Sequence, residues 1–236
     1  MELTLQQATV AARMADVSAT FAPGTITAIC GPNGAGKSTL LAALAGLLPL
    51  DAGSASAAAL PANERARRIG FLPQTGEVAW NLSVQALVGL GRLPHGDSAA
   101  EPVARALAAV DLTDKAQRPI ATLSGGERAR ALLARVLAGE PQWIFADEPL
   151  AALDLAHQRS LLGHLRKAAD AGAGVVLVLH DLPLAMNYAD QVLVMQGGSL
   201  FTHGQPEQAL SEQAIADVWK LPARWLGEKG ARGLSI

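Results

Sequence analysis

Short apolar runs alternate with longer segments of helical periodicity along most of the chain. The runs are mostly aliphatic, which is typical of strands buried on both faces, and they lie at 26–30, 69–72, 143–146, 175–179 and 191–195. Helical segments lie at 37–47, 125–138, 154–171 and 206–219. Gly197 and Gly198 together indicate a hairpin turn. Because strands alternate with helices, we predict an α/β fold with a mostly parallel sheet covered on both faces.

The middle of the chain departs from this alternation. Residues 83–91 and 101–110 look helical, and no apolar strand separates them. This pattern predicts a helical subdomain at about 76–122, inserted into a core of about 1–75 and 123–236. We therefore expect one domain with an insertion, a size that suits a chain of 236 residues.

Composition narrows the class of protein. A formal net charge of −2 disfavours a dedicated nucleic-acid binder, which usually carries a basic excess. No apolar stretch approaches the roughly 18 residues of a membrane span, and the first ten residues lack a signal-peptide pattern. Cys30 is the single cysteine, which excludes an internal disulfide and fits a reducing compartment. It lies in a predicted buried strand.

A glycine-rich loop lies between the first predicted strand and the first predicted helix. Residues 31–38 match the phosphate-binding pattern G-x-x-x-x-G-K-[ST]. Such a loop aims successive backbone N–H groups at phosphate oxygens, and the helix N-terminus adds partial positive charge. We expect Lys37 to reach the β- and γ-phosphates and Ser38 to hold Mg²⁺. The predicted nucleotide-binding residues here are Gly31, Pro32, Asn33, Gly34, Ala35, Gly36, Lys37, Ser38 and Thr39.

Two carboxylates follow the apolar run at 143–146. Asp147 and Glu148 stand at the carboxyl end of a predicted strand, where ligands of open α/β sheets bind. Adjacent side chains on an extended chain point in opposite directions, so we expect two different roles. We assign Asp147 to the magnesium shell and Glu148 to the general base that polarises the attacking water. Taken alone, an acidic pair after a strand is equally typical of a helix start.

The segment Leu-Ser-Gly-Gly-Glu at 123–127 points to a family. Ser124 can cap a helix that offers bare N–H groups and a dipole to an anion. Together with the two motifs above, the pentapeptide resembles the signature of the ATP-binding-cassette (ABC) ATPases, and the resemblance covers nearly the whole chain. It implies a P-loop NTPase core with a small antiparallel β part at the N-terminus, and it implies binding and hydrolysis of MgATP.

The resemblance also implies a head-to-tail dimer of two copies. ATP held by one copy would be covered by Ser124, Gly125 and Gly126 of the other. Asp154, in the segment Ala-Leu-Asp at 152–154, matches a loop that runs along the dimer interface. Without the dimer, Asp154 would simply cap the helix that follows.

Two polar residues at strand ends match further family positions. Gln74 follows the run at 69–72 and matches the glutamine that contacts Mg²⁺ and water. His180 ends the run at 175–179 and matches the histidine that contacts the γ-phosphate. Read without the family, a lone glutamine carries no meaning and a lone histidine is more often structural.

The adenine contact departs from the family pattern. The family usually places an aromatic residue upstream of the phosphate loop, but no aromatic residue occurs between Met1 and Thr20. Phe21 is expected in a strand beside the loop, and Arg13 could stack its guanidinium plane on the base. We therefore expect GTP to compete better here than in relatives that have the aromatic residue.

The insert is short, which favours a transporter subunit. Only 85 residues separate Ser38 from Ser124, too few for the long coiled coil of DNA-repair relatives. The segments 63–74 and 82–95 resemble those of importers of iron chelates, haem and vitamin B12. That resemblance implies integral-membrane permease subunits docked near 74–92, an extracytoplasmic binding protein, and a position at the cytoplasmic face of the membrane. The histidines show no metal-ligand spacing, so we do not expect them to bind iron or haem.

Three alternatives remain open at this level. An exporter or lipid-extracting ATPase would share every residue named above. A soluble regulator of ribosomes or DNA is disfavoured by the small insert and the mild acidity. A degenerate cassette that binds ATP without turnover is disfavoured by the presence of Gln74, Glu148 and His180.

Overall fold

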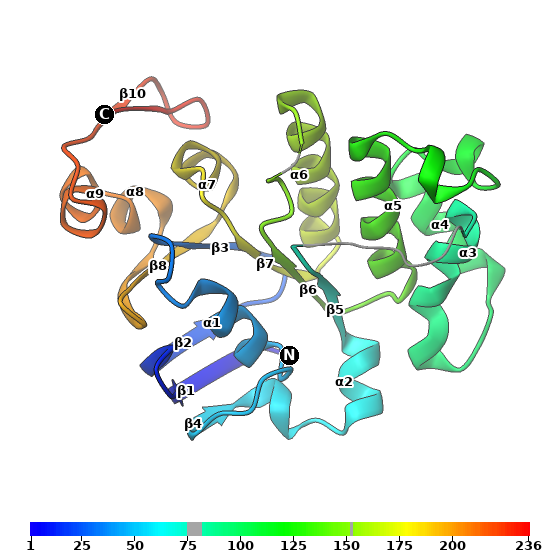
Figure 1. Ribbon diagram of the computed structural model, residues 1–236, viewed down its shortest axis with the longest axis horizontal. Helices are drawn as coiled ribbons and strands as arrows, with labels where there is room; N and C mark the ends of the chain where they lie inside the picture. The colour runs from blue at the N-terminus through cyan, green and yellow to red at the C-terminus, as the bar shows by residue number, and fades with distance from the viewer. Residues whose placement is uncertain (75–81, 152) are drawn as a thin grey trace.

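The computed structural model describes residues 1–74, 82–151 and 153–236, and a six-stranded sheet lies at its centre (Figure 1). The strand order is β5-β6-β7-β3-β8-β9, with every neighbouring pair parallel except the β8–β9 hairpin. The strands are β3 (Ile26–Cys30), β5 (Ile69–Leu72), β6 (Trp143–Asp147), β7 (Gly174–Val178), β8 (Gln191–Gln196) and β9 (Ser199–Gly204). The predicted fold class is confirmed.

Alternate side chains of the central strands enter two separate apolar clusters. Ile144 and Ala146 of β6 belong to one cluster, whereas Trp143 and Phe145 belong to the other. This two-sided burial explains why the strands are continuous apolar runs rather than alternating ones. Cys30 is fully buried in the first cluster, and burial raises the pKa of its thiol to about 12, so the thiol stays protonated.

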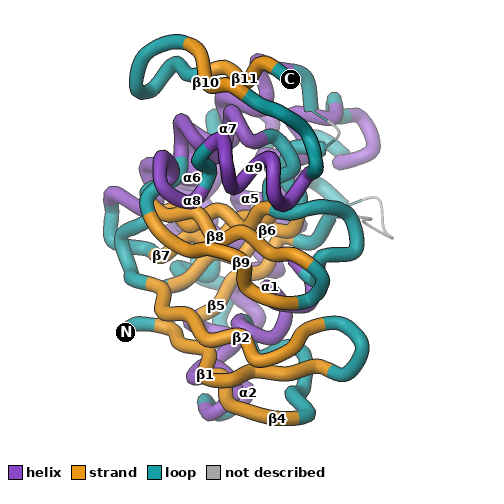
Figure 2. Tube along the Cα trace, turned by 90° about the vertical axis from the view of Figure 1, so that its left-hand side faces the viewer, coloured by secondary structure: helices purple, strands orange, loops and turns teal. Residues whose placement is uncertain are grey.

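The first cluster joins one face of the sheet to most of the helices. These include α5 (Gly125–Ala138), α6 (Leu155–Asp170), α7 (Leu182–Tyr188), α8 (Pro206–Ala209) and α9 (Glu212–Trp219). A small hairpin of β10 (Arg224–Leu226) and β11 (Gly233–Ser235) ends the chain above α7 (Figure 2).

The second cluster joins the opposite face to the N-terminal part of the chain. It packs α1 (Lys37–Leu44) between the central sheet and an antiparallel sheet of order β2-β1-β4. That sheet consists of β1 (Leu3–Val10), β2 (Met14–Phe21) and β4 (Ala52–Ala55), followed by the short 3-10 helix η1 (Ser56–Ala59) and α2 (Ala62–Arg68). Figure 2 shows it as a separate layer below the central sheet.

The described part of the predicted insert is helical. Its elements are α3 (Val84–Gly89), η2 (Leu90–His95), α4 (Ala100–Ala109), η3 (Thr113–Lys115) and η4 (Ile120–Thr122). They lie beside α5, to the right in Figure 1. The expected boundary at residue 76 falls outside the described residues, so the division into core and helical subdomain stays a prediction.

Two helices of the predicted core differ from the sequence expectation by more than one residue at an end. The first helix ends at Leu44 rather than residue 47, because Gly46 adopts a left-handed φ of 68° that no helix continues through. The tail forms two helices rather than one, since Ser211 accepts a hydrogen bond from the N–H of Ala214 and so begins α9 as its N-cap.

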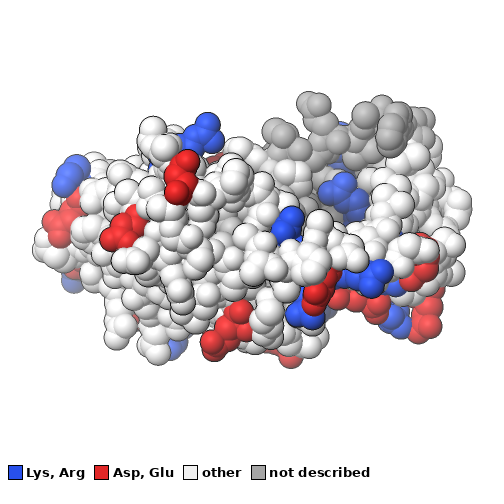
Figure 3. Space-filling view, turned by 90° about the horizontal axis from the view of Figure 1, so that it is seen from below, with Lys and Arg blue, Asp and Glu red and all other residues white. Residues whose placement is uncertain are grey.

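No helix in the described ranges is both long and apolar enough to cross a membrane. Figure 3 views the molecule from the side that carries β4 and α2 in Figure 1. Basic and acidic side chains are interspersed there, rather than gathered into one extended area of a single sign.

Candidate active site

The glycine-rich loop lies where β3 ends and α1 begins, and close backbone packing fixes its shape. Gly31 has a φ of 148°, and a Cβ there would lie 2.3 Å from the carbonyl oxygen of Met195. Gly36 has a φ of 93°, and a Cβ there would lie 2.6 Å from the carbonyl oxygen of Arg13. Only glycine fits both positions, because a side chain would meet rigid backbone.

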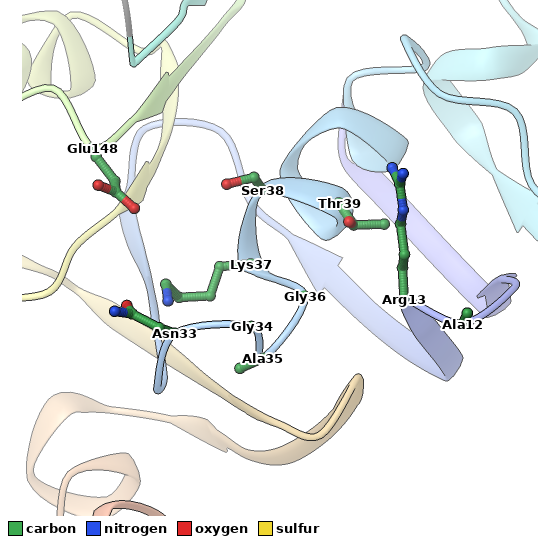
Figure 4. Close-up of a pocket in the computed structure, with 10 residues that line it drawn as sticks. All are labelled: Ala12, Arg13, Asn33, Gly34, Ala35, Gly36, Lys37, Ser38, Thr39 and Glu148. Carbon is green, nitrogen blue, oxygen red and sulfur yellow. The ribbon is translucent and has the colours of Figure 1, made fainter.

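The loop forms one side of an open cavity of about 380 Å³. In Figure 4 the side chain of Glu148 faces the loop from across this space, while Arg13 stands beside Thr39 on the other side. The residues that line it are Ala12, Arg13, Asn33, Gly34, Ala35, Gly36, Lys37, Ser38, Thr39 and Glu148. Gly31 and Pro32 are not among them, although both were predicted to bind nucleotide.

Gly31 and Pro32 contact Lys37 through their backbone. The ammonium Nζ of Lys37 donates hydrogen bonds to both of their carbonyl oxygens at 2.9 Å. The residue is only 6% exposed; burial lowers the pKa of Lys37, and the nearby charge of Glu148 opposes that shift. The side chain is thereby held inside the loop, with one ammonium proton left for another acceptor.

Ser38 and Asp147 come together from two different elements. The Oγ of Ser38, in the first turn of α1, donates to Oδ1 of Asp147 at 3.0 Å, at the end of β6. Burial raises the pKa of Asp147, and the hydrogen bond from Ser38 opposes this rise. A hydroxyl and a half-buried carboxylate at this spacing are oxygen ligands of the kind that Mg²⁺ takes.

Glu148 is held between two polar side chains. The amide Nε2 of Gln74 donates to one of its oxygens at 2.7 Å, and Nε2 of His180 lies 2.5 Å from the other. The backbone of Glu148 is left-handed, with a φ of 48°, so it no longer follows the strand. Asp147 and Glu148 thus have different partners, but this turn of the backbone separates them rather than strand alternation alone. A non-glycine residue in this conformation carries strain of a kind that is common at functional sites.

The signature segment lies away from this cavity, at the start of α5. Ser124 caps the helix by accepting from the N–H of Glu127, and the Glu127 carboxylate accepts in return from the N–H of Ser124. The hydrogen bond from Lys115 is the main cause that lowers the pKa of Glu127 to about 2. Neither Ser124 nor its two glycines, Gly125 and Gly126, line the cavity of their own chain.

Asp154 likewise lies outside the cavity and caps α6, where its carboxylate accepts from the N–H of His157 at 2.9 Å. Residue 152, at the start of the predicted interface loop, lies outside the described residues. Sequence reasoning missed His157 and Lys115, because neither belongs to a motif and only the three-dimensional fold brings them to the signature.

The turn between β1 and β2 supplies the far wall of the cavity. Ala12, with a φ of 60°, and Arg13 both lie there, and sequence reasoning missed Ala12. Phe21 is 1% exposed and stacks on His203, with ring centroids 6.3 Å apart. The strand position of Phe21 matches the expectation, and its burial removes it as a partner for a base.

The fold and the site together define a P-loop nucleotide-binding ATPase. The model of the ABC transporter family matches residues 14–151, more than half of the chain. The chain therefore belongs to the ABC transporter family, as one of its ATP-binding, ATP-hydrolysing subunits.

Relatives and solved structures agree with this assignment. The chain is 41% identical over 217 residues to the hemin import ATP-binding protein HmuV of Rhodococcus jostii, covering 88% of this chain and 74% of the relative. It is 42% identical over 219 residues to HmuV of Pseudomonas entomophila, covering 87% and 86%. A metal-chelate type ABC transporter in an inward-facing conformation superposes with a TM-score of 0.84 at 26% identity, covering 98% of this chain and 95% of that one.

Proposed function

We propose that this chain powers uptake of haem, or of a related iron chelate, through a partner permease. The observation that carries the proposal is its identity of about two in five residues to hemin import ATP-binding proteins over most of both chains. Vitamin B12 is a further cargo of the resembling group. An exporter is the second candidate, because the residues around the nucleotide do not distinguish the direction of transport.

The phosphate site fits a magnesium–triphosphate. Lys37 sits in the loop with a proton free for a phosphate oxygen, and Ser38 and Asp147 already share a hydrogen bond at the mouth of the loop. Bound Mg²⁺ would neutralise phosphate charge, held by Ser38, Asp147 and Gln74. Backbone N–H groups of the loop and of the first turn of α1, within 33–38 but without that of Ala35, which donates to Pro32, would supply the remaining donors.

Glu148 is the proposed general base. Its carboxylate faces the phosphate loop across the cavity (Figure 4), where a water in line with the γ-phosphate would stand. Gln74 and His180 hold its two oxygens, so both must exchange a hydrogen bond to Glu148 for one to water or phosphate when ATP binds. Release of these hydrogen bonds would free the carboxylate of Glu148 to accept a proton from the attacking water.

The site is proposed to be completed by a second copy in head-to-tail orientation. Ser124 and Gly125 are exposed at a capped helix start, with Gly126 buried beside them, and neither these residues nor Asp154 line the nucleotide cavity of their own chain. Backbone N–H groups at the start of this 14-residue helix suit the γ-phosphate of ATP held by the partner copy.

A groove of about 210 Å³ beside the edge of the central sheet is the proposed permease dock. Its apolar wall includes Phe71, Leu90 and Val136, and the cations Arg67 and Arg135 stand on the same groove. Burial lowers the pKa of Arg135, which favours a partner that brings a carboxylate. The expected docking range of 74–92 reaches this groove at Leu90 and Gly91. Residues 75–81 of that range lie outside the described part of the chain. Docking there would place the chain at the cytoplasmic face, with the binding protein across the membrane.

The test is growth on defined iron sources after deletion of the gene. We expect the deletion to abolish growth on haem as sole iron source and to spare growth on inorganic iron, and the unmodified gene to restore it. Glu148→Gln should fail to restore growth, because an amide is a poor base, whereas the matched surface variant Glu228→Gln should succeed.

Each other outcome has a defined meaning. Normal growth of the deletion strain on haem refutes haem as cargo. Loss of growth on a ferric siderophore, or loss of cobalamin-dependent growth, would instead identify that compound as the cargo. Full restoration by Glu148→Gln refutes the base. A pull-down of the tagged chain from detergent-solubilised membranes should recover a many-helix permease; ribosomal or DNA-bound partners in its place would refute transport.

A further inference from the structure

One imidazole joins two motifs of the same chain that belong to different elements. The ring of His157, in the first turn of α6, lies against Gly126, where an added Cβ would fall 1.9 Å from the ring carbon Cδ2. The other side of the ring faces Asp154, with Nδ1 2.7 Å from Oδ1. Because an ionised carboxylate can only accept, Nδ1 carries the proton and donates it.

The carboxylate end of this bridge is well anchored. The backbone N–H of His157 also donates to Asp154, and together with the ring it lowers the pKa of Asp154 below its usual range. The side chain of His157 is 36% exposed and that of Asp154 is 66% exposed, so the bridge lies at the molecular surface. His157 does not line the nucleotide cavity of its own chain.

The start of α5 has a second support on its other side. Lys115, in the helical insert, pairs with Glu127 at 2.5 Å, and Glu127 closes the cap on Ser124. The insert therefore holds the signature through Glu127, while α6 of the core holds it through His157.

We propose that His157 is a positioning residue that fixes the signature glycines at a set distance from Asp154, so that both meet the second copy at the same time. This inference rests on the proposed head-to-tail dimer. Ring contact sets the distance and the hydrogen bond sets the orientation, and each is needed because a displacement of about 1 Å at a reacting centre is enough to cost large factors in rate.

Two substitutions separate the two contacts. His157→Phe keeps a ring against Gly126 and loses the hydrogen bond to Asp154. His157→Asn keeps a donor at the place of Nδ1 and loses the ring. Arg159→Ala is the matched control, an exposed residue two positions along the same helix.

Dimerisation is measured in the Glu148→Gln background, where ATP is bound and not consumed. Sedimentation gives the ATP-dependent dimer dissociation constant, and a fluorescent ATP analogue gives binding to the dilute monomer. We expect His157→Phe to weaken the dimer at least about tenfold, the size of one hydrogen bond to a charged group, and His157→Asn to weaken it through loss of the ring contact with Gly126. With Glu148 restored, kcat should fall to a similar degree, while nucleotide binding by the monomer stays as in the parent.

Unchanged dimerisation and kcat in either His157 variant would overturn the inference, since one of the two contacts would then be dispensable. A loss that merely follows a lowered melting temperature would also overturn it, by reducing His157 to a fold-stabilising residue. If the Glu148→Gln parent itself forms no ATP-dependent dimer, the proposed function fails and takes this inference with it; if the parent dimerises and the variants match it, only this inference fails.

Discussion

Arg92 joins the helical insert to the end of α5, and among the arginines described at this junction its side chain is the most buried. The cost of removing it can be calculated. Its side chain is only 7% exposed. Nε and Nη2 donate to the two oxygens of Asp97 at 2.9 and 2.7 Å, while Nη1 donates to Glu140 at 3.0 Å and to the carbonyl of Ala138 at 3.1 Å.

The magnitude follows from what Arg92→Ala leaves behind. Removing one partner of a buried ion pair costs about 3–5 kcal/mol. Asp97 and Glu140 are 43% and 50% exposed, so water can solvate both carboxylates once the guanidinium is gone. The carbonyl of Ala138 loses a buried donor. We therefore expect a cost below that range, about 2 kcal/mol, the size of leaving one buried carbonyl without its donor, which lowers the melting temperature by roughly 4–8 °C for a chain of this size.

Arg105 supplies the matched control because it pairs with the same Glu140 at 2.7 Å, yet its side chain is 56% exposed. Arg105→Ala should cost less than about 1 kcal/mol. Urea unfolding of both variants, followed by circular dichroism, measures the difference. Equal losses would refute the argument, because burial is the property that separates the two arginines.

The pH dependence of the Arg92 effect has a definite sign. The hydrogen bond from Arg92 holds the pKa of Asp97 well below its usual range. A depressed carboxyl pKa adds stability above the unfolded pKa and loses it as pH falls through the folded pKa. The stability gap between the unmodified chain and Arg92→Ala should therefore stay constant from about pH 8 to about pH 5 and narrow only in stronger acid.

Two further predictions concern the nucleotide. Asp147→Asn should raise the melting temperature of the ligand-free chain at neutral pH, because a carboxyl group whose pKa is raised by burial costs stability once it is ionised. The same variant should reduce the stabilisation by MgATP, because the amide carries no charge for Mg²⁺. Thermal shift with and without Mg²⁺ measures both effects. Arg13→Ala should weaken ATP binding about fivefold, the size of one stacked cation, and the unmodified chain should prefer ATP to GTP by less than about a hundredfold in competition.

Each of these has a result that would count against it. If MgATP stabilises Asp147→Asn as strongly as it stabilises the unmodified chain, Asp147 is not a magnesium ligand. Unchanged ATP affinity in Arg13→Ala would exclude Arg13 as the adenine contact. A preference for ATP over GTP above about a hundredfold would refute the expected competition by GTP. Arg159→Ala serves as the control for both, since it lies on α6 and lines no described cavity wall of the loop.

The strands of the central sheet and the phosphate loop could be predicted because each shows as a local pattern in the sequence. Strands such as β3 and β5 lie at their predicted residues, since a strand buried on both faces has no polar position to blur its limits. The loop at 31–38 lies, as expected, between the end of β3 and the start of α1. The strands of the N-terminal sheet were not delimited individually, because β1 has register shifts in its pairing with both neighbours and its burial does not alternate cleanly.

Relations between distant segments could not be obtained from the pattern alone. The left-handed backbone of Glu148 has no local signal, since glutamate rarely adopts it. Nor did any pattern place Arg13 against Gly36, because the contact joins a β-turn to a helix start through packing. His157 could be found only once α5 and α6 were seen side by side.

The strand β5 closes one end of the central sheet, and no strand among the described residues pairs with its outer edge. Ile69, Gly70 and Phe71 of this strand line the groove proposed for the permease. An unpaired edge flanked by partly exposed apolar side chains is a template for pairing with any other extended chain. If the permease docks on this groove as proposed, the same edge would make the subunit prone to aggregate when produced alone, and binding of the permease would protect it from pairing with other chains.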